Sequence, residues 1–296
     1  MELPIKQSGS ILESTLGFLR EVVHARGFWP VALTILGLCG FYFPLVVSLP
    51  QLWLNDDHYS HGFLIPFFAG YVIWKWWPDL RNIPVKVGMI GIPFLAMSLF
   101  AGWAAMRVEQ SQLMSLAFVA SLIGALWVLL GGRWALALTL PLTFLLFMLP
   151  VWLSVIDVWT LPLQLTSTQG AYHILAALGQ HPYMDPMNPT EIDLSHFQFT
   201  VAVACSGMKL VLAVFALTGF FLMISKLKWW SQLAMLGVVL PLCLLTNSLR
   251  IAMVGLVGNT WGDEAGHQFH DWSGYISLIF CFFVLFRFAR WVGWKD

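Results

Sequence analysis

A thiol, a guanidinium and an imidazole lie at the ends of apolar segments in the C-terminal third of the chain. Cys205 belongs to an Ala-Cys-Ser-Gly run, Arg250 ends an Asn-Ser-Leu-Arg run, and His270 begins a His-Asp-Trp-Ser-Gly run. A thiolate is a nucleophile, an imidazole titrates near neutral pH and can act as base and then acid, and a guanidinium stabilises an anion. These three residues therefore supply a nucleophile, a proton carrier and an anion stabiliser.

The residues around Cys205 and Arg250 favour this chemistry. Cys205, Ser206 and Gly207 come directly before an apolar helix, whose free N–H groups and dipole favour a thiolate and can bind an oxyanion. Asn247 and Arg250 are three residues apart and share a helix face. An arginine near the depth of the hydrocarbon is costly, which makes Arg250 a functional candidate.

All three residues are predicted to lie at one depth in a membrane. Depth follows from the number of helical residues, at about 1.5 Å each, that separate a residue from a basic cytoplasmic marker. The separations are 21 residues from Cys205 to Lys226, 22 from Lys228 to Arg250 and 20 from His270 to Arg290. They correspond to roughly 30–33 Å, so each residue is expected at the outer boundary of the hydrocarbon.

The composition excludes a water-soluble globule. Of the 296 residues, 59% are hydrophobic and 10% are charged, whereas soluble domains carry roughly 25% charged residues. The formal net charge is zero, so no basic surface indicates a nucleic acid partner. We predict an all-α, polytopic integral membrane protein with about eight transmembrane helices, in the stretches 29–49, 61–77, 87–106, 111–130, 134–155, 206–225, 229–250 and 272–291.

The loops predict the orientation of these helices. Lysine and arginine occupy alternate connections, which places both termini in the cytoplasm and the acidic or histidine-containing connections outside. Segment 160–178 is apolar but contains several polar residues. If it crossed the membrane, every later basic loop would lie outside. We therefore expect an interfacial or re-entrant helix there, on the outer side. Alternating apolar runs on either side of Ser195 and His196 predict a small extracytoplasmic β-hairpin.

The chain is expected to have three parts. Residues 1–28 form a cytoplasmic N-terminal segment, in which 11–28 are predicted to form an amphipathic helix on the membrane rather than a removable signal peptide. Residues 29–291 form the transmembrane domain, and 292–296 form the cytoplasmic C-terminus. Cys39, Cys243 and Cys281 lie within apolar runs without metal-ligand spacing, so we expect no disulfide framework and no metal.

Taken in order, the motifs resemble those of the exosortase and archaeosortase family of membrane-embedded cysteine transpeptidases. The resemblance covers about residues 29–291 and rests on the Ala-Cys-Ser-Gly run, Asn247-x-x-Arg250, His270-x-x-x-Gly274 and the Tyr-Ser-His-Gly run at 59–62. It implies that Cys205 is the nucleophile and that Arg250 and His270 complete the catalytic set. The residues expected to support them are Ser206, Gly207, Asn247, Gly274 and His61. No cofactor is expected.

The resemblance also implies a reaction and a location. Family members process exported proteins with a C-terminal sorting tail, which consists of a short motif such as Pro-Glu-Pro, one transmembrane helix and a basic end. The implied reaction is attack on a peptide carbonyl beside the outer membrane face, release of the tail, and transfer of the thioester-bound protein to an acceptor. The expected setting is the bacterial inner membrane, with the active site on the periplasmic face. Membrane lipids and a lipid- or polysaccharide-linked acceptor are the further partners that it suggests.

A membrane transporter is the alternative function. In that case the groups that handle anions or protons are Arg250, His270 and the outer loop residues Asp56, Asp57 and His58. We favour the enzyme because the polar candidates crowd one boundary rather than the midplane, and because we find no internal repeat.

Three residue roles stay open at this point. His267 is the alternative to His270 as the base. Asn247 either positions Arg250 or bonds to the backbone. For Asp271 we favour a helix N-cap over a partner of the imidazole.

Overall fold

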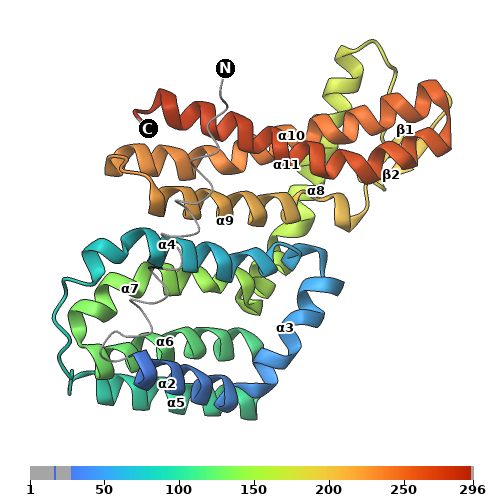
Figure 1. Ribbon diagram of the computed structural model, residues 1–296. Coiled ribbons are helices and arrows are strands. Elements are labelled where there is room, and N and C mark those ends of the chain that lie inside the picture. The colour runs from blue at the N-terminus through green and yellow to red at the C-terminus, as the bar shows by residue number, and fades with distance from the viewer. Residues whose placement is uncertain (1–16, 18–27, 295–296) are drawn as a thin grey trace. The chain divides into compact units, whose positions relative to one another are not determined.

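The structure is a computed structural model that describes residue 17 and residues 28–294, and most of these residues lie in helices (Figure 1). The amphipathic helix predicted over 11–28 lies outside the described residues, apart from residues 17 and 28. The described part divides into two compact units, which we treat separately. Of the described residues, unit 1 comprises those up to 50 and 66–151, and unit 2 comprises 51–65 and 152–294.

Unit 1 is built around helix α6 (Ser111–Leu130), which packs against three other helices of the unit. A buried polar network ties this unit together, because the Tyr42 hydroxyl lies 3.0 Å from Ser121 Oγ, which in turn donates to Ser98 Oγ at 3.1 Å. The other helices that lie wholly or mostly in unit 1 are α2 (Phe28–Phe41), α3 (Phe43–Asn55), α4 (Ile65–Leu80), α5 (Gly91–Arg107), α7 (Gly132–Phe144) and the 3-10 helix η3 (Leu145–Met148).

Unit 2 consists mainly of four long helices, which are α8 (Leu153–Ala177), α9 (Met208–Ile224), α10 (Trp229–Trp261) and α11 (Asp263–Trp291). Helices α10 and α11 lie side by side and antiparallel (Figure 1), joined by Gly262 alone, whose φ of +96° allows the sharp reversal. Helices α8 and α9 both pack against α10. The short elements are the 3-10 helices η1 (Asp57–Tyr59), η2 (Gly62–Leu64), η4 (Pro150–Trp152, at the boundary with unit 1) and η5 (Val203–Cys205).

The predicted β-hairpin is confirmed. Strands β1 (Glu191–Asp193) and β2 (Gln198–Thr200) pair antiparallel, with Ile192 opposite Phe199. Asn259 of α10 fastens the turn, because its Oδ1 accepts from the N–H of His196 at 2.9 Å and its Nδ2 donates to Gln180 at 2.8 Å. The hairpin is therefore held against the end of α10.

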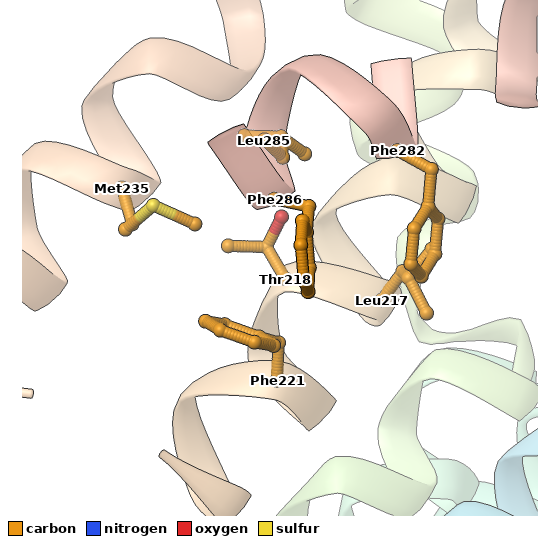
Figure 2. A pocket seen from close by; sticks show the side chains of 7 residues that line it. All are labelled: Leu217, Thr218, Phe221, Met235, Phe282, Leu285 and Phe286. Atoms are coloured by element: carbon orange, nitrogen blue, oxygen red, sulfur yellow. The ribbon is translucent and has the colours of Figure 1, made fainter. Parts of the chain in front are cut away.

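The interior of unit 2 is apolar where α9, α10 and α11 meet. Figure 2 shows a pocket of about 30 Å³ between these helices, and none of the side chains that line it is titratable. The only hydroxyl there, on Thr218, donates to its own helix at Val214 O, at 2.7 Å. The lining residues are Leu217, Thr218, Phe221, Met235, Phe282, Leu285 and Phe286. Chemistry in unit 2 must therefore be sought elsewhere.

The structure supports a helical membrane protein, but the predicted count of eight spans is not confirmed. Among the described residues, four helical segments are long and apolar enough to cross a membrane: Ser111–Leu130, Val203–Ile224, Trp229–Trp261 and Asp263–Trp291. The count rises to six if two broken pairs each act as one span, namely Phe28–Phe41 with Phe43–Asn55, which are bent by 80°, and Gly132–Met148 with Pro150–Ala177. The predicted spans 61–77 and 87–106 correspond to α4 and α5, which have only 16 and 17 residues.

The helices depart from the predicted spans in two places. Residues 251–271, which connect the predicted spans 229–250 and 272–291, are helical except at Gly262, because α10 runs on to Trp261 and α11 begins at Asp263. The extension of α10 has a partner outside the predicted span, since Ile251 and Ala252 pack against Ile192 and Val201 of the hairpin region. The predicted span 134–155 is interrupted at Leu149, and residues 160–178 fall almost entirely within α8.

The close approach of the hairpin to α10 makes a prediction about Gly258. A Cβ at Gly258 would lie 2.5 Å from Phe197 Cε1, so alanine there must displace the ring. We expect Gly258→Ala to lower the free energy of unfolding by about 1–3 kcal/mol, the usual cost of overpacking. The matched control is Gly237→Ala in the same helix, where a Cβ meets nothing within 4 Å. Thermal unfolding of the two variants in detergent measures the difference, and equal melting temperatures would contradict this packing.

Candidate active site

Cys205 ends the 3-10 helix η5, in the turn that leads into α9. Its N–H donates to Ala202 O at 2.8 Å, and its side chain is buried. The turn closes at Gly207, whose φ of +92° lies in the left-handed region that favours glycine. A Cβ at Gly207 would also lie 3.0 Å from Asn247 Nδ2. Both constraints explain why glycine follows the cysteine at this interval.

The thiol of Cys205 contacts the imidazole of His270. Their Sγ and Nε2 atoms lie 2.7 Å apart, although 65 residues separate them in the chain. The other ring nitrogen, Nδ1, lies 3.2 Å from a carboxylate oxygen of Asp271. A nucleophile within hydrogen-bonding distance of a base, with a third group beside that base, is the arrangement that activates a thiol for acyl transfer.

Arg250 joins this pair from α10. Its Nε donates to Ser273 Oγ at 2.9 Å, and its Nη2 donates to the carbonyl of His270 at 3.3 Å. The guanidinium lines the same cavity as the Cys205 thiol and is close enough for its charge to act on the sulfur. The structure therefore brings together all three residues that the sequence analysis selected, from η5, α10 and α11.

Asn247 holds the main chain of the cysteine. Its Nδ2 donates to Cys205 O at 2.9 Å, and its side chain is fully buried. Of the two roles considered for Asn247, the structure shows the bond to the backbone. Ser206 is also buried, and its Oγ accepts a long hydrogen bond of 3.3 Å from the N–H of Met208, at the start of α9.

The remaining supporting residues are less closely involved. A Cβ at Gly274 would meet only Arg250 Nη2, at an ordinary contact distance of 3.9 Å. His61 occupies the N-cap position of η2. It comes two residues after η1, which packs against α9. The side chain of Tyr59, the last residue of η1, belongs to the apolar core around Met208. Within the 59–62 run, Tyr59 therefore shares a core with the start of the helix that follows the cysteine.

The two acidic residues at the start of η1 each have a partner. Asp56 accepts from the backbone N–H of His58 at 2.9 Å, and Asp57 forms an ion pair of 2.9 Å with Lys209 of α9. The hydrogen bond from Lys209 holds the pKa of the Asp57 carboxyl below its ordinary value, so this group is ionised at neutral pH. In the part of the chain that the structure describes, no group of three or more His, Cys, Asp or Glu side chains is arranged to hold a metal ion.

One expectation about the last helix is wrong. Asp271 does not cap it, because α11 starts at Asp263 with Gly262 at the N-cap position. The cause is the extended helical hairpin of α10 and α11, which carries both helices past the predicted membrane boundary. Asp271 instead lies beside the imidazole, which is the role that the sequence analysis considered less favourable.

A cavity of about 230 Å³ opens beside the thiol. Arg250, His267 and His270 line it together with Cys205, and most of the other lining residues are apolar and come from the hairpin region and α10. The rings of Phe197 and Phe199 are stacked with centroids 5.2 Å apart. The other lining residues are Thr200, Val201, Ala202, Ile251, Val254 and Gly266. The cavity offers room for a substrate chain at the sulfur.

Sequence reasoning missed Ser273, which contacts both Arg250 and His270. Its position three residues after His270 places the two on one helix face, but that signal is shared by many serines in apolar helices. It also missed Gln164 of α8, a buried side chain that donates to Val201 O at 2.5 Å. This bond fastens the segment just before Cys205.

The fold and the site define a helical membrane protein with a thiol–imidazole pair and an arginine beside a cavity. The model of the transmembrane exosortase family matches residues 53–287, which include every residue of this site. The chain therefore belongs to the transmembrane exosortase family, and the resemblance noted in the sequence is confirmed. Comparisons with curated proteins and with solved structures returned no significant match.

Proposed function

We propose that this exosortase is a cysteine transpeptidase that removes the C-terminal sorting tail of exported proteins through a thioester on Cys205. Exosortases act on protein substrates with C-terminal sorting signals, and this supports the substrate class. The observation that carries the mechanism is the 2.7 Å contact between Cys205 Sγ and His270 Nε2. It favours the enzyme over the transporter, since a transporter needs no nucleophile paired with a base.

The first half of the reaction forms the thioester. His270 Nε2 accepts the thiol proton while the sulfur attacks the carbonyl carbon of the scissile peptide bond. Negative charge then develops on the carbonyl oxygen, and the guanidinium of Arg250 stabilises it. When the C–N bond breaks, His270 returns its proton to the nitrogen of the tail, which leaves as an amine with its transmembrane helix.

The second half releases the protein. An acceptor amine, or water, attacks the thioester carbonyl and gives a proton to His270, and the sulfur leaves and is reprotonated. A lipid- or polysaccharide-linked amine fits a site at the membrane boundary. Asp271 orients the imidazole through Nδ1 in both halves.

We also propose how the helices are oriented in the membrane. We assign residues 29–291 to the exosortase domain, with eight spans, both termini in the cytoplasm of a bacterial inner membrane, and the cavity on the periplasmic side. The basic loops support this arrangement.

Labelling of single introduced cysteines tests the orientation. Met187 is exposed in the connection between α8 and the hairpin, and Lys226 lies in the basic connection between α9 and α10. In a background without native cysteines, a membrane-impermeant maleimide should label Met187→Cys in intact cells from which the outer membrane has been stripped. Lys226→Cys should react only after permeabilisation. The opposite pattern would overturn the orientation.

Removal of the thiol tests the mechanism. Cys205→Ala and Cys205→Ser should each lower tail removal by on the order of a thousandfold or more, because loss of the nucleophile stops thioester formation. The measurement is release of the tail from an exported protein with a Pro-Glu-Pro motif, a transmembrane helix and a basic end, expressed in the same cells. Cys243→Ala, in the buried part of α10, is the matched control and should retain activity. Undiminished cleavage by Cys205→Ala would refute the proposal.

The two histidines of the cavity can be separated in the same assay. His270→Ala should lower cleavage by about 10²–10⁴-fold, the usual contribution of a general acid–base group. His267→Ala should retain most of the activity, because this exposed side chain lies 3.5 Å from Asp263 in an ion pair of its own helix. Greater loss in His267→Ala than in His270→Ala would assign the base to His267.

A further inference from the structure

Ser273 links the arginine and the histidine of the site. Its Oγ accepts from Arg250 Nε at 2.9 Å and donates to the carbonyl of His270, also at 2.9 Å. The same carbonyl accepts from Arg250 Nη2 at 3.3 Å, so the three groups close a ring of hydrogen bonds. The serine is buried, with 3% of its surface exposed. Water therefore cannot readily replace it.

The chemical type of this partner matters as much as its position. An arginine in a protein interior is usually held by a carboxylate, which fixes the guanidinium but neutralises its charge. Among the described residues, no carboxylate forms an ion pair with Arg250. A hydroxyl fixes the same nitrogen without adding negative charge. The full positive charge of Arg250 is then available to the sulfur and to an oxyanion beside it.

We infer that Ser273 is a positioning residue of the active site, which orients the uncompensated guanidinium of Arg250 toward the Cys205 sulfur and couples it to the turn that carries His270. The inference rests on the proposed function for its catalytic consequence, but its effect on the thiol does not depend on a substrate. Because Ser273 acts through Arg250, its removal should have an effect only while Arg250 is present.

Alkylation of Cys205 by iodoacetamide tests this coupling without a substrate. Cys39, Cys243 and Cys281 are replaced by alanine so that only Cys205 reacts. The charged or titratable groups around this thiol are Arg250 of α10, His267 and His270 of α11, and Asp57 of η1, the last of these paired with Lys209. At one fixed neutral pH, only the serine and the arginine are varied. A fixed guanidinium favours the reactive thiolate, so Ser273→Ala should slow alkylation about tenfold.

A double-mutant cycle decides whether the effect passes through Arg250. In the Arg250→Ala background, adding Ser273→Ala should change the alkylation rate by less than about twofold. Ser277→Ala is the matched control, since Ser277 lies one turn further along α11, is also buried and donates to Ser273 O at 2.8 Å. It should leave the rate unchanged. Equal slowing by Ser273→Ala with and without Arg250, at unchanged melting temperature, would overturn the inference.

Kinetics of tail removal by the purified full-length protein in liposomes supply the catalytic readout. Ser273→Ala should lower kcat about tenfold with little change in KM, because the guanidinium acts on the charge that develops during reaction. Ser273→Thr keeps the hydroxyl and should restore most of kcat. A rise in KM alone, or a threonine variant as slow as the alanine variant at equal melting temperature, would contradict the assignment. Failure of the proposed function is recognised separately, by cleavage that persists in Cys205→Ala.

Discussion

Polar groups in the apolar interior of a membrane protein must find partners within the protein, because hydrocarbon offers none. In unit 2 the hydrogen bonds that meet this requirement also hold the segment around Cys205. The amide of Asn247 donates to the carbonyl of Cys205, and Gln164 of α8 donates to Val201 just before it. Each bond joins two separate elements, so the bond that satisfies a buried polar group also fixes the segment that carries the thiol.

The second requirement is close approach between helices and hairpin. Gly258 of α10 lies so close to the ring of Phe197 that no Cβ would fit there. Gly266 of α11 lies against Gly258, since a Cβ added at Gly266 would be 3.1 Å from the Cα of Gly258. Small residues therefore let α10 and α11 run together beyond the predicted membrane boundary, while the hairpin packs on their ends. The cavity beside Cys205 is lined by residues of the hairpin, α10 and α11.

The charged groups near the thiol leave the positive charge of Arg250 without a carboxylate partner among the described residues. Arg250 is held by a serine hydroxyl and a backbone carbonyl, while the nearby carboxylate of Asp57 is paired with Lys209. The carboxylate of Asp271 lies on the far side of the imidazole, at Nδ1 rather than at the nitrogen that faces the thiol. Positive charge at the sulfur and a proton acceptor beside it are what the proposed thioester formation requires.

The sequence by itself determined the class of protein, the hairpin and the choice of the three residues that lie together in the structure. These depend on local quantities, namely the apolar length of segments, the alternation of side chains around Ser195 and His196, and the spacing of Cys205, Arg250 and His270 from basic loops. Only the tertiary structure decided where α10 and α11 end, that Asp271 lies beside the imidazole, and that Ser273 holds the arginine. Hydropathy marks where a helix enters hydrocarbon, but a helix continues wherever its next turn finds a partner. The partners of α10 come from a hairpin about 60 residues earlier in the chain, as the bond from His196 to Asn259 illustrates, and no local pattern encodes such a contact.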